Sequence, residues 1–240
     1  PRIDGHWGKC DKKNKKNFRT RCSALITKGS NSILIDTSPD IRLQLLKNKV
    51  KNISSVIYTH EHSDQTNGLF ELRPYYWKNK KKINIYGSFK TVNYLQKRFN
   101  YCFNKTKNYP PIVKANVIKK NFTLGKLSEK VSFKILNLKH GAIKSFAYIF
   151  EQSAYISDSN DLSIVKIKSL KNLKYLILDC LKIKKNFAHF NLKQSLYVHK
   201  HLKPNKTILT NLHSDLDYNF LKKKLPKNVI PAYDGMIIDL

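Results

Sequence analysis

Short runs of largely apolar, β-branched and aromatic residues recur through this 240-residue chain and limit the folds it can adopt. A strand buried on both faces gives a continuous apolar run, whereas a half-exposed strand alternates apolar and polar residues. We therefore expect strands that lie inside covered sheets. The predicted strands are Ser32–Ile35, Val56–Tyr58, Ile83–Tyr86, Phe133–Leu136, Ala147–Phe150, Tyr175–Leu178, Thr207–Leu209 and Met236–Ile238.

Helical patterns follow several of these runs. Ser38 directly precedes Pro39, and a Ser N-cap with Pro at the first helical position predicts a helix start there. Asn191 is expected to cap a second helix. Sheets covered by helices give an α/β fold, and we expect one domain over residues 1–240. The stretch Asn104–Asn121 predicts a long loop, which in a compact domain is functional or disordered.

The net charge of +30 favours an anionic ligand, because a basic field attracts anions. Only six of the 46 basic residues are arginine, the better bidentate reader of phosphate. We therefore interpret most lysines as solvated surface residues, and do not favour nucleic acid as the partner. A small anionic phosphodiester fits the charge better, and the sequence leaves a homodimer open.

The four cysteines, Cys10, Cys22, Cys102 and Cys180, have no CxxC or CxC spacing. This pattern argues against a zinc ribbon or a redox pair and fits a reducing cytoplasm. The chain lacks an apolar run of the roughly 20 residues that a membrane helix needs. It also lacks a signal-peptide pattern. The sequence therefore predicts a cytoplasmic protein without a membrane partner.

The strongest local signal is Thr59-His60-Glu61-His62-Ser63-Asp64, directly after the predicted strand Val56–Tyr58. Alternate residues of an extended chain point to the same side, so His60 and His62 can converge on one point and Asp64 can follow as the chain turns. Imidazole and carboxylate are ligands of Zn²⁺, Mn²⁺ and related ions. The spacing therefore predicts a divalent metal site, Zn²⁺ or Mn²⁺.

Further potential ligands follow other predicted strands. His140, Asp158 and His213 each come just after an apolar run. Side chains at strand ends gather at one edge of a sheet in α/β folds. Each residue alone could have a purely structural role instead of binding a metal; Asp158, for example, could simply form a turn. Together with the motif they predict one metal centre.

These residues resemble the ordered motifs of the metallo-β-lactamase superfamily, and the chain is most similar to its phosphoribosyl 1,2-cyclic phosphate phosphodiesterases. The resemblance extends almost from end to end. It is carried by the motif His60-x-His62-x-Asp64 with Asp36, His140 and Asp158, and by the stretches Arg21–Ser23, Leu34–Asp40, Phe99–Tyr101, Leu209-Thr210, Asp215–Tyr218 and Pro231–Gly235.

The resemblance implies an αββα sandwich of two sheets covered by helices. It places His60, His62, His140 and Asp158 around a first metal, and Asp64 and Asp158 at a second. It also implies two catalytic residues. Asp64 would orient or deprotonate the attacking water, and His189 would donate a proton to the leaving oxygen or stabilise the transition state. The competing interpretation of His189 is packing beside a helix cap.

The chain departs from the family pattern at three places. Gln65 and Asn211 stand where relatives usually have histidine, and amides bind such metals more weakly than imidazole does. We therefore expect one ion and leave the second open, with His213 as a substitute ligand. Relatives also begin with a strand that would precede Pro1, so we expect the domain to lack its N-terminal strand.

The predicted function is hydrolysis of a small, cyclic phosphodiester by attack of metal-bound hydroxide. Three alternatives stay open. The first is an RNA-processing nuclease of the same fold, which the basic charge favours. The second is a catalytically decayed metal-binding member, which Gln65 and Asn211 permit. The third is acyl or thioester hydrolysis, because the same nucleophile attacks carbonyl carbon.

Overall fold

The computed structural model describes residues 2–240 and divides them into two compact units. Arg21–Lys134 form the first, here called the amino-terminal unit. Ile135–Leu240, together with the segment that ends at Thr20, form the second, here called the carboxyl-terminal unit. The expectation of a single domain stays a prediction, and each unit is described by itself.

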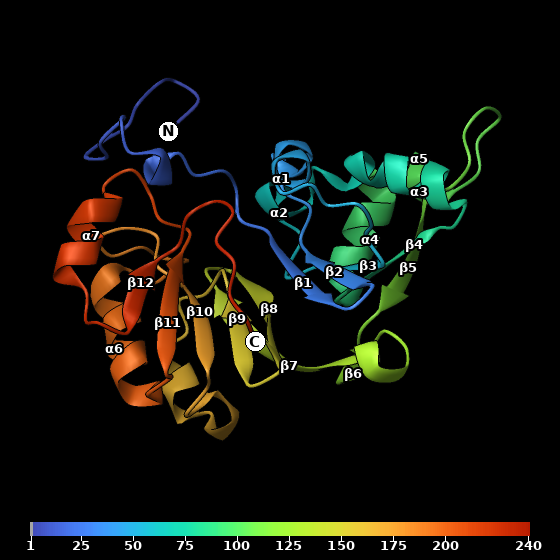
Figure 1. Cartoon of the computed structure of the whole chain (residues 1–240). Helices are drawn as coiled ribbons and strands as arrows, with labels where there is room; N and C mark the ends of the chain where they lie inside the picture. The colour runs from blue at the N-terminus through green and yellow to red at the C-terminus, as the bar shows by residue number, and fades with distance from the viewer. Residues whose placement is uncertain (1) are drawn as a thin grey trace. The chain divides into compact units, whose positions relative to one another are not determined.

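The amino-terminal unit contains a five-stranded sheet in the order β1-β2-β3-β4-β5 (Figure 1). β1 pairs with β2 antiparallel, and the remaining pairs are parallel. Parallel pairing needs crossover connections, and helices supply them between these strands. The strands are β1 (Ala24–Lys28), β2 (Asn31–Ile35), β3 (Ser55–Ile57), β4 (Ile83–Gly87) and β5 (Val113–Val117).

The helices of this unit bury their apolar side chains against the sheet. Ile41 and Leu45 of α1, Leu95 of α4 and Cys102 of α5 share one buried cluster with Val56 of β3. Removing this apolar surface from water stabilises the unit. The helices are α1 (Ile41–Lys47), α2 (Ser63–Thr66), α3 (Arg73–Asn79), α4 (Phe89–Arg98) and α5 (Asn100–Phe103), with 3₁₀ turns η2 (Leu69–Leu72) and η3 (Leu127–Glu129).

The carboxyl-terminal unit contains the strands of a second sheet, in the order β12-β11-β10-β9-β8-β7 (Figure 1). β9, β10, β11 and β12 are parallel, whereas β8 and β9 are antiparallel. The strands are β7 (Val131–His140), which starts in the other unit and pairs there with β6 (Phe122–Leu124), then β8 (Ile143–Phe150), β9 (Ser153–Ile156), β10 (Tyr175–Asp179), β11 (Lys206–Thr210) and β12 (Val229–Pro231).

Two helices pack on this second sheet. Val198 and Leu202 of α6 (Leu192–Leu202) share a buried cluster with Leu176 of β10. Leu221 of α7 (Tyr218–Lys224) is buried with Leu209 of β11. The unit also contains the 3₁₀ turns η1 (Lys15–Asn17), η4 (Leu162–Lys166) and η5 (Lys168–Leu170).

The predicted strands are confirmed except for one. Met236–Ile238 form no strand, and Ile237 is 85% exposed, so this apolar run is not a buried strand. Asn191 caps α6 as predicted, with a reciprocal bond between its side chain and Gln194. The predicted cap at Ser38 is wrong: α1 begins at Ile41, and Ser38 Oγ instead accepts a hydrogen bond from the backbone N–H of Asp40.

The predicted long loop Asn104–Asn121 is partly wrong, because β5 lies inside it and pairs with β4. The alternation of charged and apolar residues in Val113–Val117 marks a half-exposed strand at the sheet edge. All four cysteines are free thiols. Among the described residues, no helix has the length and apolar character needed to cross a membrane.

Candidate metal centre

In the amino-terminal unit, two parallel strands end side by side at the predicted motif. Ile35 of β2 is in register with Ile57 of β3, so the residues that follow both strands meet at one sheet edge. Asp36 adopts the left-handed conformation, φ 61°, which Asp tolerates better than most residues. Its buried carboxylate accepts hydrogen bonds from the backbone N and the Oγ1 of Thr59, both at 2.8 Å.

This contact orients His60. Thr59 Oγ1 gives its only hydrogen to Asp36, so it accepts a hydrogen bond from His60 Nδ1, at 3.0 Å. Nε2 of His60 is then an acceptor, and it lies 3.0 Å from His62 Nδ1. His60 is buried and His62 is exposed. Asp36 and Thr59 thus act as the outer partners that metal-binding histidines require.

The neighbouring carboxylates differ in their roles. Asp64 lies in the first turn of α2, and Gln65 Nε2 is 3.5 Å from its Oδ2. Gln65 stands where members of the family that this sequence resembles usually have histidine, and here it contacts the Asp64 carboxylate. Glu61 forms an ion pair with Lys90 at 2.6 Å. Burial raises the pKa of Glu61, but the bonds to Lys90 outweigh it and lower that pKa, so Glu61 is engaged by α4.

In the carboxyl-terminal unit, the fold brings three potential metal ligands together. His140 ends β7, Asp158 follows β9, and His189 precedes α6; one ligand atom from each lies within 4.8 Å of the others. His140 Nδ1 donates to the carbonyl of Ala188 at 2.8 Å. Because that hydrogen fixes the tautomer, Nε2 of His140 is the atom left to bind a metal.

Asp179, the last residue of β10, belongs to the same group although sequence reasoning missed it. Its carboxylate is fully buried and accepts a hydrogen bond from His189 Nδ1 at 2.8 Å. Burial raises the pKa of Asp179 to about 7, although the bond to His189 lowers it. The available signal was an aspartate that ends an apolar strand, ten residues before His189.

Asn211 follows β11 in the left-handed conformation, φ 60°. Its side-chain nitrogen contacts the Ser157 carbonyl, Asp158 Oδ1 at 3.3 Å and Asp179 Oδ1 at 3.4 Å. An amide at this position therefore binds both carboxylates directly. His213, the predicted substitute ligand, lies outside the group found in the described residues, and its Nδ1 is 3.6 Å from Asp215 Oδ1.

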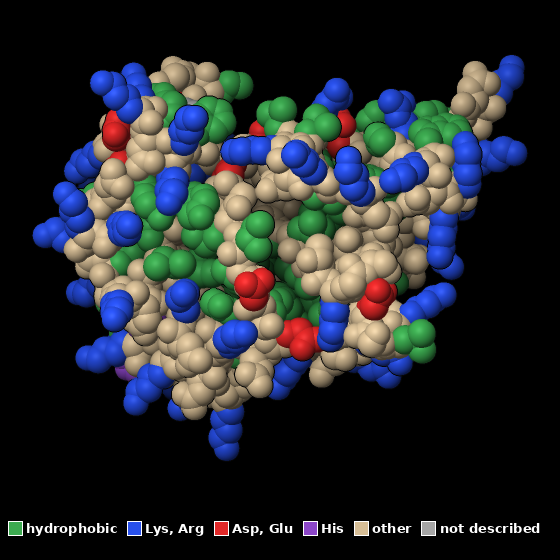
Figure 2. Space-filling model, in the orientation of Figure 1, with side chains coloured by type: hydrophobic (Ala, Val, Ile, Leu, Met, Phe, Trp, Pro, Cys, Tyr) green, Lys and Arg blue, Asp and Glu red, His purple; other side chains and the backbone are tan. Residues whose placement is uncertain are grey.

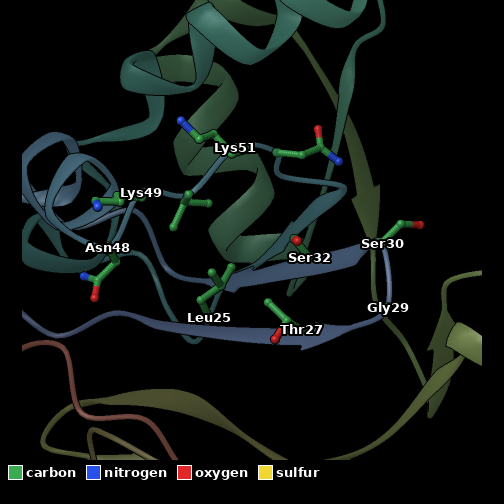
Figure 3. A pocket seen from close by; sticks show the side chains of 10 residues that line it. Leu25, Thr27, Gly29, Ser30, Ser32, Asn48, Lys49 and Lys51 are labelled. Carbon is green, nitrogen blue, oxygen red and sulfur yellow. The ribbon is translucent and has the colours of Figure 1, made fainter.

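A hollow in the amino-terminal unit lies away from this chemistry. It is lined by Leu25 and Thr27 of β1, Ser32 of β2 and the segment from Asn48 to Asn52 (Figure 3). None of its lining residues is a histidine or carries a carboxylate. This hollow therefore lacks the side chains that bind a divalent metal in proteins.

The donor atoms fit a divalent ion. His140 presents a fixed Nε2 beside the buried Asp158, and His60 presents a fixed Nε2 beside His62. Neutral imidazole and carboxylate suit Zn²⁺, Mn²⁺ and similar ions. A buried carboxylate beside a second one is costly without a cation, because desolvation and repulsion both disfavour the charged forms. The chain is thus built for a divalent metal.

A family model described as the β-lactamase superfamily domain matches residues 31–211. Among solved structures, a diphosphatase of the PhnP family is 26% identical with a TM-score of 0.85, over 95% of this chain and 87% of its own. The short form of human tRNase Z is 16% identical with a TM-score of 0.65, over 91% of this chain and 92% of its own.

A curated relative, an octanoyltransferase of Porphyromonas gingivalis, is 28% identical over the whole of this chain. The chain spans about half the length of that relative, 49%. The match of the family model covers most of the chain, and the solved structures share its α/β fold. The chain therefore belongs to the metallo-β-lactamase superfamily of metal-dependent hydrolases.

Proposed function

We propose that this chain hydrolyses a phosphorus–oxygen bond in a small phosphodiester or diphosphate ester. The observation that carries the proposal is the His140, Asp158 and His189 group, in which hydrogen bonds to Ala188 and Asp179 fix both imidazoles. A metal ligand and a proton-transfer group within one cluster suit hydrolysis of an ester.

The ligands of the ion stay those predicted from the sequence, with His60, His62, His140 and Asp158 as the first set. When bound, the ion stabilises negative charge on the phosphoryl oxygens and lowers the pKa of a water molecule toward about 7. Asp64 would orient or deprotonate the attacking water. The role of His213 as a substitute ligand stays a prediction. Binding of a second ion beside Gln65 and Asn211 stays open.

His189 is the proton donor in this proposal. Its Nδ1–H donates a hydrogen bond to Asp179. The proton that is given to the leaving oxygen is therefore the one on Nε2 of the doubly protonated ring. Donation from Nε2 to the departing oxygen stabilises the alcohol or phosphate product. Asp179 holds the ring in place and stabilises its positive charge, in the way that a buried carboxylate supports a catalytic histidine elsewhere.

The substrate class rests on charge and on the relatives. A net charge of +30 attracts anions. The diphosphatase supports a phosphoric anhydride or ester, and tRNase Z supports RNA as an alternative substrate. The octanoyltransferase favours a second candidate function, hydrolysis of a medium-chain acyl thioester. On the face shown in Figure 2, Lys and Arg side chains are spread widely.

Metal content tests the ligand set. Purified protein is loaded with Zn²⁺ or Mn²⁺, desalted and analysed for metal per chain. His60→Ala and His140→Ala are each expected to lose the same single ion if they share it. His201→Ala, an exposed histidine on α6 bonded to the Tyr197 carbonyl, is the control and keeps full metal. Independent loss of two different ions would contradict a shared centre.

Turnover tests the reaction. The metal-loaded protein is given a cyclic phosphodiester, a diphosphate ester, an RNA oligonucleotide and octanoyl coenzyme A. We expect the highest kcat/KM on one of the two small phosphoesters. Preference for the thioester would select the second candidate function, and preference for RNA would select the nuclease. Full metal without turnover of any substrate would identify a decayed, metal-binding member.

A further inference from the structure

Phe187 is an exposed aromatic side chain beside the candidate centre. It lies two residues before His189, and its side chain is 80% exposed. Single apolar residues on a surface are common and need no explanation by themselves. Phe187 differs because hydrogen bonds hold the chain on both sides of it.

Asparagine side chains fix this segment. Asn160 Nδ2 donates to the Phe187 carbonyl at 2.6 Å, and Asn160 Oδ1 accepts from Gly141 N at 3.2 Å. Asn186 Oδ1 accepts from the backbone N of Ala188 at 2.8 Å and of His189 at 3.1 Å. Phe187 is thereby tied to the residue after His140 and to the segment after Asp158.

The ring also contacts the metal-ligand segment itself. Gly141 has φ 58°, and a Cβ there would lie 3.1 Å from both Phe187 Cε2 and Ala188 Cβ. Glycine therefore suits both the positive φ and the close approach at this position. One edge of the ring is therefore supported by Gly141, while most of its surface stays in contact with water.

Lysines precede the ring in the sequence. Lys182, Lys184 and Lys185 precede Phe187 in the same connection between β10 and α6, and the last two are exposed. An aromatic ring beside lysines is complementary to a ligand with a planar base and a phosphate, because stacking and charge act together.

We propose that Phe187 is a specificity-determining residue that stacks on a planar ring of the substrate, which makes the substrate a nucleotide-like phosphoester. This inference rests on the proposed function and narrows its substrate class. Stacking of one base on one aromatic side chain contributes about 1.4 kcal/mol, a tenfold change in affinity.

Two cyclic phosphodiesters test the proposal through turnover. Adenosine 2′,3′-cyclic phosphate and glycerol 1,2-cyclic phosphate share a five-membered phosphodiester ring, and only the first has a base. In Phe187→Ala, the ratio of kcat/KM for the adenosine compound over the glycerol compound is expected to fall about tenfold, chiefly through KM. Phe187→Trp is expected to restore the ratio, since tryptophan also stacks.

Phe220→Ala is the matched control, because Phe220 is 43% exposed on α7 of the same unit. It should leave both substrates unaffected. An equal loss on both substrates in Phe187→Ala, or an unchanged ratio, would overturn the proposal. Calorimetric measurement of adenosine 5′-monophosphate binding tests stacking on Phe187 without relying on turnover. About tenfold weaker binding in Phe187→Ala supports the ring site even if the proposed reaction fails, and equal binding, or none in the unmodified protein, overturns it.

Discussion

At the scale of single residues, both units orient a histidine by a hydrogen bond at its Nδ1 atom. His60 and His140 each donate a hydrogen bond through Nδ1, to the Thr59 hydroxyl in one case and to the Ala188 carbonyl in the other. A hydrogen on Nδ1 makes Nε2 the atom that can coordinate a metal ion. The ring then needs no change of tautomer when an ion binds. The histidines are therefore oriented before any ligand arrives.

Asp179→Asn is expected to reduce kcat about 100-fold on the preferred substrate, the size of one general acid's contribution. The amide keeps the shape but no longer stabilises a positive charge on His189. Steady-state kinetics check this, with KM and metal content expected to change little. The kcat of His189→Ala should fall by a similar factor, and the double variant should be no worse than either single one.

Asp161→Asn is the control, since Asp161 caps the 3₁₀ turn η4 in the same unit. Asp179 acts through His189 and not on the substrate, so a second measurement is needed. The limb of the pH–kcat profile that reports the acid should shift in Asp179→Asn and be absent in His189→Ala. A variant that loses its metal together with its activity would instead assign Asp179 a purely structural role.

The sequence singled out candidate ligands more readily than the residues that support them. His60, His62, His140 and Asp158 were proposed because ligand types at strand ends follow a spacing rule, and their role as ligands stays a prediction. Asp179 was missed because its role depends on a histidine that joins it only in the folded chain. The contact of Asn211 with two carboxylates was likewise hidden, since it comes from a left-handed residue after β11.

At the scale of elements, a helix cap at Asp217 is one of the contacts that attach the N-terminal segment to the rest of the carboxyl-terminal unit. Asp217 caps α7 by accepting from Phe220 N at 2.8 Å. The same carboxylate accepts from Asp11 N at 3.1 Å and from Asn17 Nδ2 at 2.6 Å. Burial raises the pKa of Asp217, but these hydrogen bonds outweigh it and lower that pKa.

Asp217→Ala is expected to lower the free energy of unfolding by about 1 to 2 kcal/mol at pH 7, as loss of an N-cap does. A carboxyl group with a lowered pKa stabilises the fold above its unfolded value, near pH 4, and this stabilisation is lost as the pH falls through the folded pKa. The difference from the unmodified protein should therefore shrink below about pH 4. Urea unfolding at pH 7 and pH 3 measures it.

Asp217→Asn separates the cap from the charge. Asparagine also caps helices, so this variant should lose less stability than alanine. The difference in stability between the two variants should not depend on pH, because neither has a carboxyl group at position 217. If Asp217→Asn and Asp217→Ala were equally unstable at pH 7, the carboxylate charge and not the cap geometry would hold the segment.

Interior elements were predicted more accurately than edge elements. β3 and β10 were recognised because strands buried on both faces are continuously apolar. β1, β5, β6 and β12 were missed, and all of them lie at a sheet edge, where the pattern is short or mixed with polar residues. The short interior strand β9 was also absent from the predicted strands. Met236–Ile238 was a false strand because hydropathy alone does not supply a partner strand.

At the scale of the whole molecule, the excess of basic charge is the property that no single element explains. The chain carries 46 basic and 16 acidic residues, and most of the basic ones are lysines. Family membership confirms the α/β metallo-β-lactamase fold predicted from the motifs, but it does not fix the partner. Charge is what makes RNA and a small anion competing substrates for this fold.

Salt dependence separates these two partners. If the lysines are only a diffuse field, binding of a single-stranded RNA oligonucleotide should be weak, with a Kd of about 10⁻⁴ to 10⁻⁶ M near physiological salt. The KM of a small phosphoester should change only a few-fold between 50 and 500 mM salt, because one or two charges are neutralised. Fluorescence anisotropy and initial rates measure the two quantities. Tight RNA binding that falls steeply with salt and inhibits small-substrate turnover would mean that the lysines form a nucleic-acid site, and the chain would then act as a nuclease.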